Sequence, residues 1–370
     1  MRYLVLIFIL VSCTSKEQHI PPTTESESLN TMLTSASYDI IDLDEVKVDT
    51  LIITDEMIIF EELYVDEDLA LPNPYKVKVF GDFLVFNSFG SSHVVATDRH
   101  TGEPLQRIGR SGRGPGEFNS PFELNTAGEF LYIYNSELKM YSLFDTDLNY
   151  IRSFSFSPIQ GAMFSNHAEM NDQYLLILNH DVSNMHSEAG STQMLEARLI
   201  SDPDSIVFRS MPRLIPTGMQ PSAYNNVLFS LNDQNRIAAV YPGLPFLFLF
   251  DNFEHTLTVK LEAAYMDSIQ NPSLSPFPPR GNQGERVSSL YRKIHYLPDN
   301  RLLLHTNSGL HLFKVEDNGR VTHKARYHIE GESERVYNLT SIRSIDHNPE
   351  NPNELYVVGW GEPVYRLILP

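Results

Sequence analysis

The sequence predicts an all-β protein, a six-bladed β-propeller with four-stranded blades, and three observations lead to this fold. Beyond the N-terminal segment, no long stretch keeps the 3.6-residue period of an amphipathic helix. Short runs rich in Val, Ile, Leu, Phe and Tyr recur instead, separated by Gly, Pro, Asn and Asp. One pattern, consisting of a turn, a buried strand, a second turn and a second strand, occurs six times along the chain.

The six copies can be aligned on their buried strands. These strands are expected near residues 84, 131, 175, 237, 302 and 355. A four-stranded blade needs roughly 40–50 residues, and the longer intervals contain evident loop insertions. A β-sandwich is the main structural alternative, but six repeats exceed what one sandwich normally uses.

The last copy stops at Pro370, soon after its expected third strand. Ring closure then needs a fourth strand from elsewhere in the chain. The segments Thr50–Thr54 and Met57–Phe60 directly precede the first blade and are placed to supply it. An N-terminal strand that closes the last blade would remove an open sheet edge and tie the two ends of the propeller together.

The N-terminus has the features of an export signal. One positive charge precedes an apolar run from Leu4 to Val11, which is too short to span a membrane, and Ser12 and Cys13 follow. The segment Leu10-Val11-Ser12-Cys13 resembles the bacterial lipobox, which implies that residues 1–12 are a lipoprotein signal peptide and that Cys13 carries lipid. Residues 13–40 are expected to form a flexible tether, and residues 41–370 the propeller.

Charge and cysteine content exclude several classes. The net charge of −19 argues against nucleic-acid binding, which needs clustered Lys and Arg. Cys13 is the only cysteine, so no disulfide is expected. With nucleic acid excluded, the expected partners are the membrane, through the lipid anchor on Cys13, and a glycan or an envelope protein.

One stretch, from Gly109 to Pro121, contains spaced glycines followed by Phe118 and Pro121, and it leads into two strand patterns. This stretch resembles an NHL repeat. Together with the lipobox, the chain resembles the TolB-like six-bladed propeller lipoproteins of Bacteroidota, and Lys16-Glu17 is similar to their surface-export signal. The resemblance implies a lipoprotein of the cell envelope, anchored in the outer membrane, and it leaves open whether the protein faces the periplasm or the cell surface. It implies no particular activity, because that family has none that is settled.

The sequence has no recognisable catalytic or metal-binding motif. His-Glu-x-x-His, Gly-x-Ser-x-Gly, a phosphate loop and a calcium loop are all absent. We therefore expect no cofactor, no metal site and no catalytic residue that short motifs can identify. Paired carboxylates from distant blades stay open as an alternative.

Three long connections are each expected to join the outer strand of one blade to the inner strand of the next, and so to emerge on one face. They are Gly109–Pro121, Met211–Tyr224 and Asp267–Glu285. The candidate binding residues on this face are Arg110, Arg113, Arg213, Tyr224, Phe277 and Arg280. The first hypothesis is a non-catalytic binding or scaffold propeller for a glycan, peptide or partner protein. The alternative is a hydrolase or lyase with a metal or paired acids in the central channel.

Overall fold

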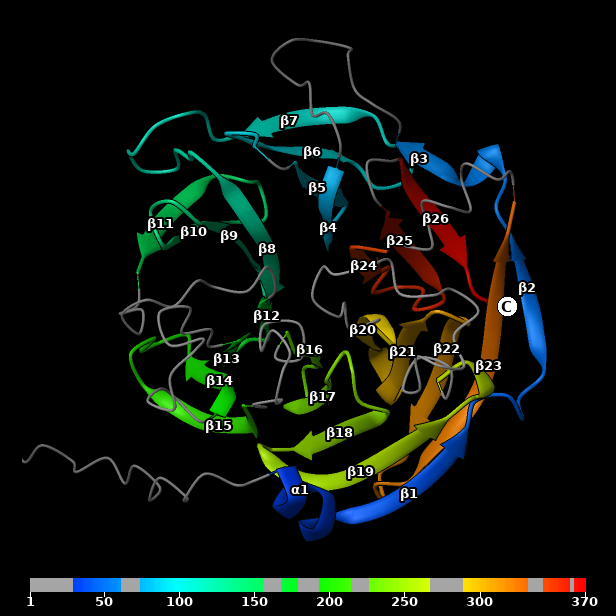
Figure 1. Ribbon diagram of the computed structural model, residues 1–370. Helices are drawn as coiled ribbons and strands as arrows, with labels where there is room; N and C mark the ends of the chain where they lie inside the picture. Colours follow the sequence, from blue (N-terminus) through cyan, green and yellow to red (C-terminus); the bar gives the residue numbers. More distant parts are fainter. Residues whose placement is uncertain are drawn as a thin grey trace, which may run out of the picture.

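The computed structural model is a ring of six β-sheets (Figure 1). It describes residues 29–60, 74–88, 90–155, 168–178, 193–213, 226–266, 289–331, 342–359 and 363–370. Each sheet is one blade, and the strands of a blade follow one another from the central axis outwards. The predicted six-bladed propeller is therefore confirmed.

The first three blades each take four consecutive strands. Blade 1 consists of β4 (Pro74–Phe80), β5 (Phe83–Ser88), β6 (Val94–Asp98) and β7 (Pro104–Ile108). Blade 2 consists of β8 (Pro121–Ala127), β9 (Phe130–Asn135), β10 (Met140–Phe144) and β11 (Tyr150–Phe154). Blade 3 consists of β12 (Ala168–Met170), β13 (Tyr174–Leu178), β14 (Gln193–Leu199) and β15 (Ile206–Pro212).

The last three blades each add a strand from the N-terminal segment. Blade 4 consists of β16 (Leu228–Leu231), β17 (Arg236–Val240), β18 (Phe246–Asp251) and β19 (Glu254–Glu262), with β1 (Ser37–Asp42) outside them. Blade 5 consists of β20 (Tyr291–Leu297), β21 (Arg301–Thr306), β22 (Gly309–Val315) and β23 (Val321–Glu330), with β2 (Val48–Ile52) outside them. Blade 6 consists of β24 (Ser344–His347), β25 (Glu354–Val358), β26 (Val364–Ile368) and β3 (Ile58–Phe60).

Ring closure follows the prediction in one segment and differs in the other. Strand β3 pairs antiparallel with β26, so the Met57–Phe60 segment closes blade 6. The Thr50–Thr54 segment does not take part in this closure, because β2 pairs in parallel with β23 of blade 5. The N-terminal segment thus runs along the outside of blades 4 and 5 before it closes blade 6 (Figure 1).

The expected tether over residues 13–40 overlaps with ordered structure at its end. Residues Leu29–Ser35 form helix α1, and β1 pairs in parallel with β19. Met32 is fully buried against blades 3 and 4, which gives this short helix an apolar anchor. Within the described part of the chain, no helix is long and apolar enough to cross a membrane.

The core is divided into six apolar clusters, one between each pair of adjacent blades. Strand β5 shows how the sequence produces this arrangement. Leu84 and Phe86 pack towards blade 6, whereas Val85 packs towards blade 2, because successive side chains of a strand point to opposite faces. Middle strands are covered on both faces, which explains their continuous apolar sequences.

In the Gly109–Pro121 connection, one glycine is required by the backbone conformation and by close packing. Gly109 has a positive φ of 78°, and a Cβ at this position would lie 2.3 Å from the ring of Phe118. Phe118 is fully buried and packs near Phe144, with ring centroids 6.2 Å apart. Glycine therefore lets the crossing from β7 to β8 close tightly over one apolar ring.

Candidate functional site

The inner strands β4, β8, β12, β16, β20 and β24 surround the central axis (Figure 1). Their pairing with the second strands shows which residues lie at the same level. In each blade, one inner-strand residue pairs with the second-strand residue that directly follows position 84, 131, 175, 237, 302 or 355. These six residues, here called the axial ring, are Lys78, Asn125, Glu169, Ser230, His295 and Asp346.

All six residues of the axial ring are polar, and all but Lys78 are buried. Burying a polar or charged group costs free energy unless a partner compensates it. Three of the same strands carry a further charged residue two positions before the ring residue, on the side of the crossing connections. These residues are Lys76, Glu123 and Lys293. The axis therefore carries a ring of six polar residues and, next to it, three further charged residues.

Some of these groups join neighbouring inner strands. The Asp346 Oδ2 atom accepts a hydrogen bond from the backbone N–H of Val79 at 2.7 Å, which links blade 6 to blade 1. The Ser230 Oγ atom accepts one from the backbone N–H of Tyr296 at 3.0 Å, which links blade 4 to blade 5. Part of the axial ring thus holds the blades together at the axis.

The charged groups are close enough to shift one another's pKa values. The Lys76 Nζ and Glu123 Oε1 atoms form a buried ion pair at 3.0 Å. Burial raises the pKa of Glu123, and Lys76 opposes that shift. Burial, reinforced by the charge of Lys76, lowers the pKa of Lys293 to about 7. Burial alone would lower the pKa of Lys78, but Asp346, Glu169 and Glu123 raise it above its ordinary value.

An aromatic cluster lies at the end of the axis where the crossing connections enter. Tyr75 and Phe122 are the second residues of β4 and β8, and their ring centroids are 5.3 Å apart. The guanidinium of Arg343, directly before β24, lies 4.8 Å from the centroid of the Tyr75 ring. All three residues are partly exposed, and Tyr75 and Phe122 directly precede the charged residues Lys76 and Glu123 of their own strands. We call Tyr75, Phe122 and Arg343 the aromatic mouth.

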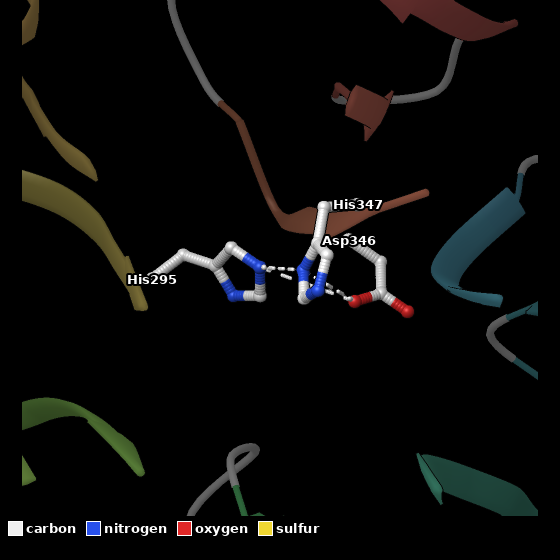
Figure 2. A group of neighbouring side chains, drawn as sticks. All are labelled: His295, Asp346 and His347. Carbon is white, nitrogen blue, oxygen red and sulfur yellow. Dashed lines mark hydrogen bonds and ion pairs between the residues drawn. The ribbon is translucent and has the colours of Figure 1, made fainter. Parts of the chain in front are cut away.

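A second cluster lies at the opposite ends of β20 and β24. Figure 2 shows the ring of His347 between His295 and Asp346. The His295 Nε2 and His347 Nδ1 atoms are 3.1 Å apart. The Asp346 Oδ1 atom lies 3.7 Å from His347 Nδ1 and 3.9 Å from His295 Nε2. Burial lowers the pKa of both histidines, so both rings are neutral near pH 7.

The predicted binding residues are only partly within the described chain. Arg110 and Arg113 lie in the β7–β8 crossing, and the Arg110 guanidinium contacts Glu117 Oε1 at 2.7 Å. Arg213 directly follows β15. Tyr224, Phe277 and Arg280, like the lipidation candidate Cys13, lie outside the described residues. The structure therefore leaves these residues as predictions, while it shows that the charge of Arg110 is balanced within its own loop.

The sequence analysis did not predict the axial residues as site residues, although the sequence contains a signal for them. Each residue of the axial ring stands three positions before a turn residue. These turn residues are Gly81, Gly128, Asp172, Asp233, Pro298 and Pro349. Alignment of the six copies at this position would have revealed one polar residue per blade. A search for histidines alone does not find the pattern, because only one of the six is histidine.

Fold and axis together define a six-bladed β-propeller with a charged centre and an aromatic mouth. No protein-family model matches the chain, and no curated protein matches it. Among solved structures, the chain is similar to a member of the DUF4221 family from Bacteroides vulgatus, at 11% identity and a TM-score of 0.49, over 88% of this chain and 98% of that one.

Two further solved structures are similar to the chain. A putative exported protein from Bacteroides fragilis has 10% identity and a TM-score of 0.46, over 87% of this chain and 88% of that one. A gluconolactonase from Xanthomonas campestris has 9% identity and a TM-score of 0.49, over 88% of this chain and 96% of that one. Each is a similarity of chain fold alone.

Proposed function

We propose that this protein is a lipid-anchored binding protein of the cell envelope that holds a glycan against its aromatic mouth. The observation that carries the proposal is the position of Tyr75 and Phe122 beside the buried Lys76–Glu123 pair. Partly exposed aromatic faces pack against the apolar faces of sugar rings. The partly exposed guanidinium of Arg343 beside Tyr75 can supply directional hydrogen bonds to hydroxyl or carboxylate groups.

The proposal places the ligand on the face that the sequence analysis chose, but nearer to the axis. The inner strands of blades 1, 2 and 6 begin there, so Tyr75, Phe122 and Arg343 belong to three adjacent blades. Strands hold such residues more rigidly than loops do, which favours a preformed site. A peptide is the other ligand class that this chemistry would accept, and the test below separates the two.

The test measures binding of neutral and uronic-acid oligosaccharides by isothermal titration calorimetry, with short peptides as a parallel panel. We expect at least one oligosaccharide to bind, and Tyr75→Ala to weaken that binding about tenfold, which corresponds to about 1.4 kcal/mol. Tyr38→Ala is the matched control, because Tyr38 is an exposed tyrosine on the outer strand β1. Binding of peptides alone, or an equal loss in Tyr38→Ala, would contradict the glycan site.

The same samples test the enzymatic alternative. Glu123, Glu169 and Asp346 bring three carboxylates to the axis, which is the arrangement that a hydrolase or lyase with paired acids would need. Chromatography of each bound oligosaccharide after incubation detects any cleavage. The binding proposal predicts intact ligand, whereas products that disappear in Glu123→Gln would replace it with the enzymatic one.

Lipid anchoring makes a separate prediction. Cys13→Ala is expected to move the protein from the membrane fraction to the soluble fraction of the envelope, because the acyl chains supply roughly 0.8 kcal/mol of membrane affinity per buried methylene. Ser12→Ala keeps a small residue before the cysteine and serves as the control. Fractionation followed by immunoblotting measures the shift, and a Cys13→Ala protein that stays in the membrane fraction although its residues 1–12 have been removed would rule out the anchor.

A further inference from the structure

The geometry at His295, Asp346 and His347 points to a metal site that no sequence motif reveals. Within the described chain, these residues are the one group of three potential metal ligands whose donor atoms converge. The triangle formed by His295 Nε2, His347 Nδ1 and Asp346 Oδ1 has sides of 3.1, 3.7 and 3.9 Å. A point equidistant from its corners lies about 2.1 Å from each atom, which is the distance at which zinc binds nitrogen and carboxylate oxygen.

Two of the three ligands are held in place before any metal arrives. His295 lies on the inner strand β20 and Asp346 on β24, and both side chains are buried. The backbone N–H of Val79 occupies Asp346 Oδ2, so that Oδ1 faces the histidines. A fixed hydrogen bond to the second oxygen of a ligating carboxylate is the usual way in which a protein orients such a ligand.

The charges around the cluster are compatible with a cation. Lys78 Nζ lies 3.9 Å from the same Asp346 Oδ1 atom and balances its charge in the metal-free protein. Glu169 and Glu123 lie near enough to Lys78 to act on it electrostatically. Lys78 and Lys293 act on His295 with positive charge. Asp346 supplies negative charge in the cluster, and Glu169 supplies it near Lys78.

Access to the cluster is from the side of His347. The side chain of His347 is 22% exposed, whereas those of His295 and Asp346 are 5% and 8% exposed.

Three protein ligands leave a fourth position of a tetrahedral ion for water or a ligand. We propose that His295, Asp346 and His347 bind one divalent zinc-type ion with an open fourth position. This site is independent of the aromatic mouth.

A second histidine pair, which lies within blade 5, provides a contrast. The His311 Nδ1 and His323 Nε2 atoms are also 3.1 Å apart. No carboxylate joins them in a metal-ligand group of the described residues, and the Nε2 atom of His311 lies within hydrogen-bonding distance of Thr306 and Ser308. Two close histidines are thus present in both places, but only the axial pair has the third ligand.

The test uses the untagged full chain in detergent, stripped with EDTA and titrated with Zn²⁺ by calorimetry. We expect one zinc ion per chain. His347→Gln and Asp346→Asn should weaken binding by more than roughly tenfold. His347 is partly exposed, and Asn can still accept the Val79 N–H bond, so both variants should keep the fold. His323→Gln is the matched control and should bind as the wild type does.

A second readout identifies the ligands directly. Co²⁺ in place of zinc should give the visible absorption of a four-coordinate ion, and His347→Gln should lose it while circular dichroism shows an unchanged fold. Absence of zinc binding by the wild type, or equal binding by His347→Gln and the wild type, would overturn the proposal. Loss of binding only in His323→Gln would place the metal at the other pair and would overturn it as well.

Discussion

Gly102→Ala is expected to destabilise the protein by roughly 2–5 kcal/mol, through a clash of about 1–3 kcal/mol and a strained backbone of about 1–2 kcal/mol. Gly102 lies in the β6–β7 turn of blade 1 at a φ of +74°, and a Cβ there would lie 2.1 Å from the backbone oxygen of Ile59. Ile59 belongs to β3, the strand that closes blade 6. The substitution therefore disturbs the packing of β3, the strand that closes the ring.

Gly81→Ala is the matched control for this prediction. Gly81 has a φ of +58°, but nothing lies within 4 Å of the Cβ that alanine would add. It should lose only the backbone contribution of about 1–2 kcal/mol. Urea unfolding of both variants measures the difference. Equal losses of unfolding free energy in the two variants would mean that β3 does not pack against the β6–β7 turn of blade 1.

Lys76→Met is expected to cost about 3 kcal/mol of unfolding free energy, because it leaves Glu123 buried without its ion-pair partner and with only the more distant charge of Lys293 acting on it. Both side chains of this pair are 7% exposed, and the two atoms are 3.0 Å apart. The double variant Lys76→Met/Glu123→Leu should recover most of the loss, since an apolar pair of similar volume removes the uncompensated charge. Guanidinium unfolding of the two single variants and the double variant gives the coupling.

The pH dependence of the Lys76→Met defect follows from the raised pKa of Glu123. Burial already raises this pKa above 4.5, and Lys76 works against the shift. Without Lys76, the folded protein holds a proton on Glu123 that the unfolded chain releases above its ordinary pKa. Stability then increases as the pH falls from above the folded pKa towards 4.5. The defect should therefore be smaller at pH 5 than at pH 8, and a larger defect at pH 5 would contradict this account.

The blades could be predicted from sequence because each one repeats a local pattern. Gly81 and Asp82, for example, form the turn between β4 and β5, and the strands on both sides have apolar sequences. Closure by β3 followed from topology, since blade 6 has only three consecutive strands, β24, β25 and β26, and needs a fourth. Both conclusions need only neighbouring residues and the requirement that no edge stay open.

The outer strands and the axis could not be predicted in the same way. Strands β1 and β2 pair in parallel with β19 and β23, more than two hundred residues away, and their own sequences do not specify a partner. His295 and His347 are 52 residues apart and meet only because β20 and β24 are neighbours around the axis. Ligand spacing within one segment reveals sites on a helix or loop, whereas a propeller assembles its centre from separate blades.

The measurement that tests the central claim most directly is a crystal structure of the protein with the tightest-binding oligosaccharide. The account predicts an intact sugar ring packed on Tyr75 and Phe122, with its polar groups directed towards Arg343. A sugar bound instead at the outer strands β1 and β2, or a mouth filled by protein with no sugar in contact, would contradict it.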